Sequence, residues 1–300
     1  MLHAENVTVD FRRSRRAKLR ALDSVTLDIP KGAFFALLGE NGAGKSTAMY
    51  CFLGLLRPTS GRVTIDGQPP RLGSPLFERI AYLPEEPHYP EFLTVEEAVN
   101  YYAALFRRAI PAAERSKILD RLGLGPFRNL RIAKCSKGMK QKVGIAQSLL
   151  NTPDLLFLDE PMRGLDPAGV HDFRDILLEM NRNGATIVMN SHILAEVEAV
   201  ATAVAVLHRG RVVASGDVAS LTRIDGNIYD VVFDCSELPP MVSDPIREEN
   251  RWTATAAKES LSALLSFLQS ANGNLVSCEL KRMSLEDRFL SIVRQEREHA

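Results

Sequence analysis

The sequence has few cysteines, and nothing in their spacing would make them work together. The four are Cys51, Cys135, Cys235 and Cys278, and no C-x-x-C pair occurs. A disulfide framework or a zinc site needs cysteines at close, matched spacings. The scattered cysteines argue against a disulfide-stabilised protein and against a zinc site, and they predict a protein that functions in a reducing compartment.

Long apolar runs and a net charge are also missing. No stretch of about 18 apolar residues occurs, so no membrane-spanning helix is expected. The opening residues, MLHAENVTVDF, lack the apolar core of a secretory signal, so none is expected. Lysine and arginine number 37 against 37 acidic residues, so no global field draws the chain to nucleic acid or anionic lipid. The hydrophobic content of 45% over 300 residues is enough for a sizeable core in one large or two modest domains.

One short glycine-rich segment carries the first chemical signal. GENGAGKST matches G-x-x-x-x-G-K-[ST], with the strand-length run AFFALL before it and the helix-length run STAMYCFLGLL after it. Bare glycine backbone lets N–H groups turn inward towards an anion, and the helix dipole adds positive potential. Lys45 is expected to reach the β- and γ-phosphates of a nucleotide, and Ser46 to ligate Mg²⁺. The predicted nucleotide-binding residues are Gly39, Glu40, Asn41, Gly42, Ala43, Gly44, Lys45, Ser46 and Thr47.

Short apolar segments alternate with helical patterns along most of the chain and predict a parallel α/β core. Helical patterns occupy 94–123 and 168–181, and 203–216 reads as a hairpin that turns at Arg209-Gly210. The basic run RRSRRAKLR at 12–20 is interpreted as a solvated hairpin loop, with lipid or phosphate contact as the alternative. Strands are expected at 5–11, 22–29, 33–38, 63–67, 80–83, 155–160 and 185–192.

The pattern changes after about residue 220. The segments IYDVVFD, RWTATAA, ESLSALLSFLQ, NLVSCEL and SLEDRFLSIVRQ predict a small strand–strand–helix–strand–helix unit. Ser284 and Asp287 fit a helix start of the S-x-x-[DE] type. We therefore expect a nucleotide-binding domain over 2–219 and an accessory α+β domain over 220–300.

A second motif, LLFLDE at 155–160, indicates what the nucleotide is used for. Asp159, at the end of a buried strand, is expected to hold the Mg²⁺ shell. Glu160 is expected to orient or deprotonate a water molecule for attack on the γ-phosphate. Adjacent Asp-Glu favours water as the phosphate acceptor, and transfer to a small molecule remains the alternative.

In these motifs and their order, residues 2–219 resemble the nucleotide-binding subunits of ATP-binding-cassette (ABC) transporters. The resemblance implies an α/β P-loop ABC ATPase core with an antiparallel β subdomain and a helical subdomain. It implies that Glu160 is the general base and that His192, in NSH, contacts the γ-phosphate. It also implies that Asp166, in GLDP, crosses a dimer interface and that Phe11 stacks on adenine.

The segment CSKGMKQKVGIAQSLL resembles the signature of this family but departs from its LSGGQ. Cys135, Lys137 and Met139 replace a leucine, a glycine and a glutamine, whereas Ser136 and Gly138 are retained. A serine hydroxyl and open N–H groups at a helix N-terminus can still meet the γ-phosphate of an opposite subunit. Lys137 is expected to face either phosphate or solvent.

A second departure is Glu85 in AYLPEEP, where the family usually has a glutamine that touches Mg²⁺ and the attacking water. A glutamate still offers an oxygen ligand to a hard cation, but adds a negative charge. The resemblance thus implies Ser46, Asp159 and Glu85 as metal ligands. The alternative is that Glu85 and Glu86 are loop charges without a role at the metal.

The family also implies partners. ATP and Mg²⁺ would be held between this chain and a second ABC ATPase chain, most simply a copy of itself. An integral membrane permease subunit would hold the pair on the cytoplasmic face of the cell membrane, and no stable nucleic-acid partner is expected. The aromatic residues near the family's docking position are Phe92, Tyr101, Tyr102 and Phe106, for which core packing is the alternative.

TVEEAVNYYAALF and SLEDRFLSI look like cassettes of bacterial exporters for drugs, antibiotics or polysaccharides. The expected function is therefore the ATPase subunit of an exporter. A non-transport ABC ATPase acting on ribosomes or nucleic acid is the alternative, although the second cassette or long coiled coil of such proteins is missing from the sequence. A small-molecule P-loop kinase would have no use for the signature and GLDP elements.

Overall fold

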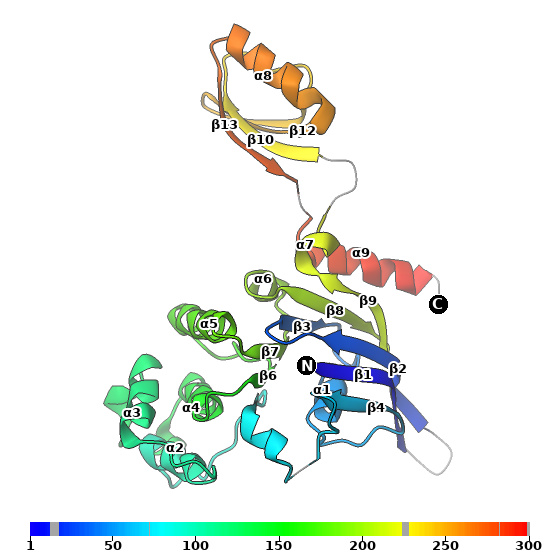
Figure 1. Ribbon diagram of the computed structural model, residues 1–300. Helices are drawn as coiled ribbons and strands as arrows, with labels where there is room; N and C mark the ends of the chain where they lie inside the picture. Colours follow the sequence, from blue (N-terminus) through cyan, green and yellow to red (C-terminus); the bar gives the residue numbers. More distant parts are fainter. Residues whose placement is uncertain (13–17, 72, 224–227, 282, 299–300) are drawn as a thin grey trace. The chain divides into compact units, whose positions relative to one another are not determined.

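The computed structural model describes residues 1–12, 18–71, 73–223, 228–281 and 283–298 (Figure 1). The chain divides into two compact units, Met1–Val218 together with Ile292–Ala300, and Ala219–Ser291. The expected boundary at 219/220 lies beside this division, whereas the residues from Ile292 onward group with the first unit. The assignment of two domains stays a prediction.

The first unit begins with an antiparallel sheet of order β2-β1-β4, built from Leu2–Arg12, Lys18–Ile29 and Ser60–Ile65. The predicted loop over 12–20 is wrong at its two ends. Arg12 lies in β1 and Lys18–Arg20 lie in β2, and residues 13–17 are outside the described residues. The reason is cross-strand charge pairing, because Arg20 lies opposite Asp10 and its Nε is 2.9 Å from Asp10 Oδ1.

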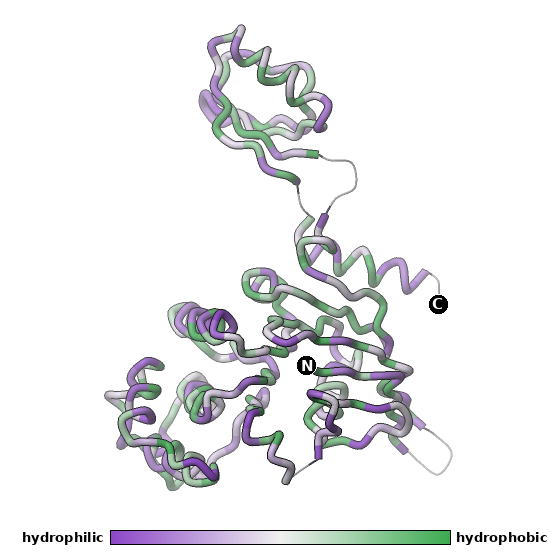
Figure 2. The backbone as a smooth tube through the Cα atoms, viewed as in Figure 1, coloured by the Kyte–Doolittle hydropathy of each residue, from purple (hydrophilic) through white to green (hydrophobic). Residues whose placement is uncertain are grey.

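A six-stranded sheet of order β5-β6-β7-β3-β8-β9 forms the centre of this unit. The strands are Ile80–Leu83, Leu155–Asp159, Thr186–Asn190, Phe34–Leu38, Ala203–His208 and Arg211–Asp217. The first five run parallel and the last is antiparallel, which confirms the α/β core and the hairpin. Every residue of β3, β6 and β7 is buried. Hydrophobic residues also make up most of β8 (Figure 2). Because parallel strands end at the same edge, this arrangement brings the motifs after β3, β6 and β7 together.

Helices surround this sheet, and side chains cap the starts of three of them. Thr94 and Glu97 form a reciprocal capping box at the start of α2, Ser136 caps α4, and Asp166 caps α5. Figure 1 shows α2, α3 and α4 grouped away from the antiparallel sheet. The α-helices of this unit up to Val218 are Lys45–Phe52 (α1), Val95–Ala103 (α2), Ala112–Arg121 (α3), Lys137–Leu149 (α4), Pro167–Arg182 (α5) and Leu194–Glu198 (α6). Short 3-10 helices cover Pro75–Arg79, Gly125–Phe127 and Ile132–Lys134.

The aromatic residues near α2 lie largely at the surface. Phe92 is 75% exposed and Tyr101 is 53% exposed, while Tyr102 and Phe106 are half-buried. Core packing therefore does not account for Phe92 and Tyr101. Among the residues that the structure describes, no helix combines the length and the apolar character needed to cross a membrane.

The second unit contains a four-stranded antiparallel sheet of order β11-β12-β10-β13. Its elements are Val218–Leu221 (α7), Ile228–Asp234 (β10), Ser243–Glu248 (β11), Arg251–Ala257 (β12), a 3-10 turn Lys258–Ser260, Leu261–Ser270 (α8) and Asn274–Leu280 (β13). The two strands predicted before α8 are confirmed as β10 and β12, but the prediction missed a third strand, β11. All six of its residues are exposed, so this edge strand carries no alternating apolar pattern to predict it from.

The last helix, α9, covers Leu285–Glu298 and passes from the second unit into the first. Its predicted start is confirmed. Ser284 Oγ accepts a hydrogen bond of 3.0 Å from the backbone N–H of Asp287, and the two side chains are also bonded.

Candidate functional site

The glycine-rich segment forms the turn between β3 and α1. Gly44 has φ 107°, and a Cβ at this position would lie 2.6 Å from the carbonyl oxygen of Ala21. A Cβ on Gly39 would lie 2.5 Å from the carbonyl oxygen of Leu207. Both the backbone conformation and the close approach of neighbouring backbone therefore require glycine here. The result is the strand–turn–helix shape that the sequence predicted for phosphate binding.

Lys45 begins α1 and is held inside this turn. Its Nζ donates hydrogen bonds to the carbonyl oxygens of Gly39 at 2.7 Å and Glu40 at 3.3 Å, and the residue is only 8% exposed. Burial lowers the pKa of Lys45, and the charges of Glu160 and Asp159 act in the opposite direction. The carboxylate of Glu40 lies 2.6 Å from Arg297 Nη2 of α9, within the same unit.

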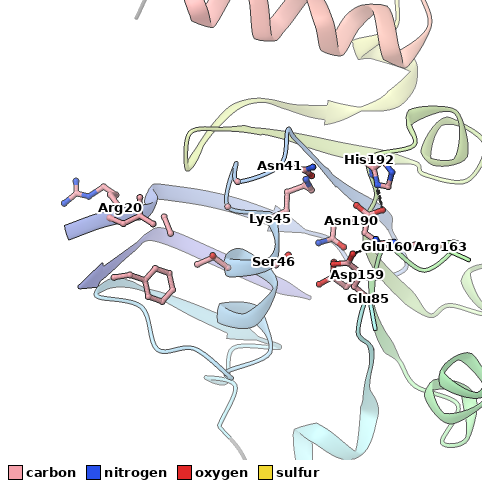
Figure 3. A pocket seen from close by; sticks show the side chains of 16 residues that line it. Arg20, Asn41, Lys45, Ser46, Glu85, Asp159, Glu160, Arg163, Asn190 and His192 are labelled. Carbon is pink, nitrogen blue, oxygen red and sulfur yellow. Dashed lines mark hydrogen bonds and ion pairs between the residues drawn. The ribbon is translucent and has the colours of Figure 1, made fainter. Parts of the chain in front are cut away.

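A single cavity of about 540 Å³ brings most of the predicted site residues together. Figure 3 shows Lys45 and Ser46 between Arg20 at one end and Glu85, Asp159, Glu160 and His192 at the other. The predicted residues that line it are Phe11, Asn41, Gly42, Gly44, Lys45, Ser46, Thr47, Glu85, Asp159, Glu160 and His192. The cavity is also lined by Leu19, Arg20, Ala21, Arg163 and Asn190, which sequence reasoning did not select.

Two adjacent carboxylates sit where β6 ends. Asp159 is 4% exposed, and burial raises its pKa. The charge of Glu160 also raises this pKa, whereas the charge of Lys45 lowers it. Glu160 adopts φ 48°, which is uncommon for a residue with a side chain, and its N–H donates to the carbonyl of Asn190 at 3.0 Å. The turn directs Glu160 towards His192, whose Nδ1 lies 2.7 Å from Glu160 Oε2.

The oxygen atoms around Asp159 suit a hard divalent cation. The Asp159 carboxylate and the Ser46 hydroxyl line the same cavity, and Mg²⁺ prefers oxygen ligands that include substrate phosphates and water. Burial disfavours the charge on Asp159, which a bound cation would offset. Among the described residues, no cluster of three or more His, Cys, Asp or Glu forms a protein-only metal cage. The donor set therefore fits a magnesium ion that is carried in with phosphates.

The other end of the cavity is lined by an aromatic and an aliphatic side chain. Phe11 is 41% exposed and lies opposite Leu19, which is 51% exposed, on neighbouring strands. Such a surface suits stacking with the flat face of a nucleobase. Arg20 at this end is bound to Asp10 and also to Asp23, with Nη1 3.0 Å from Asp23 Oδ1.

Six predicted nucleotide contacts do not line this cavity. Gly39, Glu40 and Ala43 belong to the same glycine-rich segment, and the other three lie elsewhere. Ser136, Gly138 and Asp166 line a different cavity of about 440 Å³. Ser136 Oγ accepts from the N–H of Met139 at 3.2 Å, and Asp166 Oδ1 accepts from the N–H of Gly169 at 3.2 Å. The cavity around Lys45 and the cavity around Ser136 are thus separate within one chain. This separation is expected if a nucleotide site forms from the first cavity of one chain and the second cavity of another.

The charged residues that depart from the family pattern are paired in the structure. Lys137 Nζ lies 3.5 Å from Glu86 Oε1, and Arg163 forms an ion pair with Glu85. Both interpretations of Glu85, as a metal ligand or as a loop charge without a role at the metal, stay predictions, because an ion pair is compatible with either. For Lys137, the choice between phosphate and solvent omitted a third possibility, a neighbouring carboxylate.

The residues that sequence reasoning missed had only weak signals. Arg20 was part of the run interpreted as a loop, and Leu19 and Ala21 were apolar residues beside it. Arg163 lies directly before GLDP and Asn190 lies two positions before His192, so closeness to a motif was the available signal. Their positions in the cavity depend on strand pairing and on the turn after Glu160.

A phosphate cradle that faces a carboxylate able to activate water defines a nucleotide-hydrolysing protein of the P-loop class. Residues 22–163 match the family described as ABC transporter. The chain is 38% identical over 288 residues to "Uncharacterized ABC transporter ATP-binding protein sll0415" of Synechocystis sp., an alignment that covers 93% of this chain and 80% of that protein. The chain therefore belongs to the ATP-binding proteins of the ABC transporter family, and it is an ATPase.

Two further relatives bear on assembly and role. The chain is 36% identical over 213 residues to "Lantibiotic transport ATP-binding protein SrtF" of Streptococcus pyogenes, over 71% of this chain and 89% of that one. It also resembles the solved structure "Dimeric structure of a post-hydrolysis state of the ATP-binding cassette MJ0796 bound to ADP and Pi", with a TM-score of 0.65 and 26% identity. The match covers 73% of this chain and 99% of that one. These likenesses also confirm the predicted P-loop ABC ATPase fold.

Proposed function

We propose that this chain hydrolyses ATP to power export of a substrate through a separate membrane protein. The observation that carries the proposal is the cavity in which Lys45, Asp159 and the Glu160–His192 pair lie together. The likeness to a lantibiotic transport ATP-binding protein supports a transport role. Ribosomes or nucleic acid as the target gain no support from the relatives or from the balanced charge.

We assign a separate role in ATP hydrolysis to each group of residues that lines the cavity. The loop N–H groups and the Lys45 ammonium bind the phosphates. Ser46, Asp159 and Glu85 would hold Mg²⁺, which when bound supplies charge neutralisation for the phosphates. Glu160 accepts a proton from the attacking water, and Phe11 stacks on the adenine ring. His192 holds the Glu160 carboxylate by one oxygen, which leaves the other for that water molecule.

We propose that two copies of the chain complete each other's sites. Ser136, Gly138 and Asp166 would contact the ATP held by the P-loop of the second chain. The separation of the two cavities in one chain supports this arrangement, as does the likeness to a dimeric cassette. The exposed side chains of Phe92 and Tyr101 are candidates for contact with the membrane protein. The pair would then sit at the cytoplasmic face of the membrane.

The experiment combines hydrolysis with fractionation. Purified protein should release phosphate from ATP, and Glu160→Gln should not. In cells that produce tagged protein, the cassette should remain in the supernatant when it is produced alone. If a neighbouring gene encodes an integral membrane protein, producing that protein as well should make the cassette sediment with membranes. Sedimentation with ribosomes in both cases would overturn the transport proposal and favour the alternative.

A further inference from the structure

Arg163 occupies an unusual position in the nucleotide cavity. Its backbone N–H donates to the carbonyl of Glu160 at 3.2 Å, so the residue lies in the turn that starts at Glu160. Its guanidinium leaves this turn and forms an ion pair with Glu85, on the loop that follows β5 (Figure 3). One residue thus connects the loop of Glu85 to the turn of Glu160.

The turn that carries Arg163 is firmly held. Pro161 and Met162 are buried, and the buried amide of Gln141 in α4 donates to the carbonyl of Pro161 at 3.0 Å. Packed residues therefore anchor the backbone next to Arg163, from which its exposed side chain reaches Glu85. An anchored cation of this kind can hold a carboxylate on a less constrained loop.

The charges in the cavity explain why Glu85 requires such a partner. Glu85, Asp159 and Glu160 are three carboxylates around one space, and that space must accept the negative phosphates of ATP. The proposed function assigns the Lys45 ammonium to the phosphates, and Arg20 is paired with two aspartates, so neither cation is left to offset Glu85. An unpaired carboxylate at position 85 would repel both the other carboxylates and the γ-phosphate.

We propose that Arg163 is a positioning residue for Glu85. The ion pair cancels the additional negative charge and holds the Glu85 carboxylate by one oxygen, so that the other oxygen stays available to the metal and the attacking water. This rests on the proposed function, because it places ATP in this cavity. A second pair on the same loop, Glu86 with Lys137 of α4, shows that the adjacent residues Glu85 and Glu86 each face a cation.

The proposal is tested by ATP binding in EDTA, measured by isothermal titration calorimetry without turnover and without metal. Arg163→Ala should weaken ATP binding about tenfold, the effect of about 1.4 kcal/mol of uncompensated repulsion. The double variant Glu85→Gln with Arg163→Ala should bind ATP within about twofold of Glu85→Gln alone, because an amide needs no counter-charge. Arg163→Lys should retain most of the affinity, since it keeps the cation.

Each alternative gives a different pattern. If the double variant binds as weakly as Arg163→Ala, then Arg163 contacts the phosphates directly and the positioning role is wrong. If Arg163→Ala binds ATP as tightly as the wild type, the pair has no role in the site. A wild-type protein that binds no ATP would instead refute the proposed function, so the two failures are distinguishable.

The chain offers a matched control. Arg121 and Glu179 form an ion pair between α3 and α5, with side chains 43% and 50% exposed, against 45% and 41% for Arg163 and Glu85. Neither control residue lines the nucleotide cavity. Arg121→Ala should leave ATP affinity unchanged. If Arg163→Ala does not fold by circular dichroism, Arg163→Gln carries the same expectations with a smaller loss of side-chain volume.

Discussion

Nδ1 of His192 lies 2.7 Å from Oε2 of Glu160, and the backbone N–H of His192 points to the same oxygen at 3.4 Å. The Glu160 side chain is 13% exposed and the His192 side chain is 58% exposed. The exposed histidine therefore contacts the mostly buried Glu160 carboxylate from the solvent side. Because both contacts use one oxygen, the carboxylate is oriented with its other oxygen available for water.

Replacing Glu160 by glutamine should separate binding from hydrolysis. The amide keeps the size and one oxygen but accepts no proton, so turnover should fall by about 10²–10⁴-fold. ATP should still bind, and a nucleotide-bound dimer should accumulate. Phosphate release and gel filtration with ATP measure the two effects. Glu179→Gln, at an exposed pair outside the cavity, is the control, and wild-type turnover in Glu160→Gln would refute its role as the base.

Replacing Lys45 by alanine should weaken ATP binding itself. The ammonium is the buried cation of the phosphate loop, and a hydrogen bond to a charged group contributes about 1.5–3 kcal/mol, or roughly 10–150-fold in affinity. Titration with a fluorescent ATP analogue measures the loss. Lys117→Ala, on α3 and away from the cavity, should bind like the wild type. Unchanged affinity in Lys45→Ala would place the phosphates elsewhere.

Hydrolysis should depend on protein concentration. Ser136 and Asp166 do not line the cavity of Lys45, so one chain alone leaves the site incomplete. Activity per molecule should rise as the protein is concentrated, with sedimentation velocity reporting the dimer under the same conditions. Constant activity down to dilutions at which only monomers sediment would contradict the two-chain site.

The cysteines should differ sharply in reactivity. Burial raises the pKa of Cys51 to about 11, and it also raises the pKa of Cys135 and of Cys278. Only the thiolate reacts with alkylating reagents, so the raised pKa keeps Cys51 protonated at pH 8. Cys278 is the one exposed cysteine of the four, so iodoacetamide should modify it first. Peptide mass spectrometry would show this order, and unfolding in guanidinium should abolish it. Early labelling of Cys51 in the folded protein would contradict the buried α1.

Much of the site was predictable from the sequence because its parts are local. The phosphate loop needs glycines where side chains would collide with backbone, and those glycines are visible as a motif. The strands that carry the motifs are short apolar runs, and all five residues of β3, β6 and β7 are buried. Helix starts such as Thr94 with Glu97 use side chains within one turn of the backbone that they bond.

Only the tertiary structure decided which distant residues meet. The order β6-β7-β3 places Asn190 beside Asp159, and the turn after Glu160 sends Arg163 to Glu85. The same holds for the exposed edge strand β11, and for the end of α9, which groups with the first unit. The physical reason is that a local pattern records which face of an element is buried, whereas ion pairs between loops depend on strand order and on turns. A sequence alone therefore determined the class of chemistry, and the fold determined how its charges are balanced.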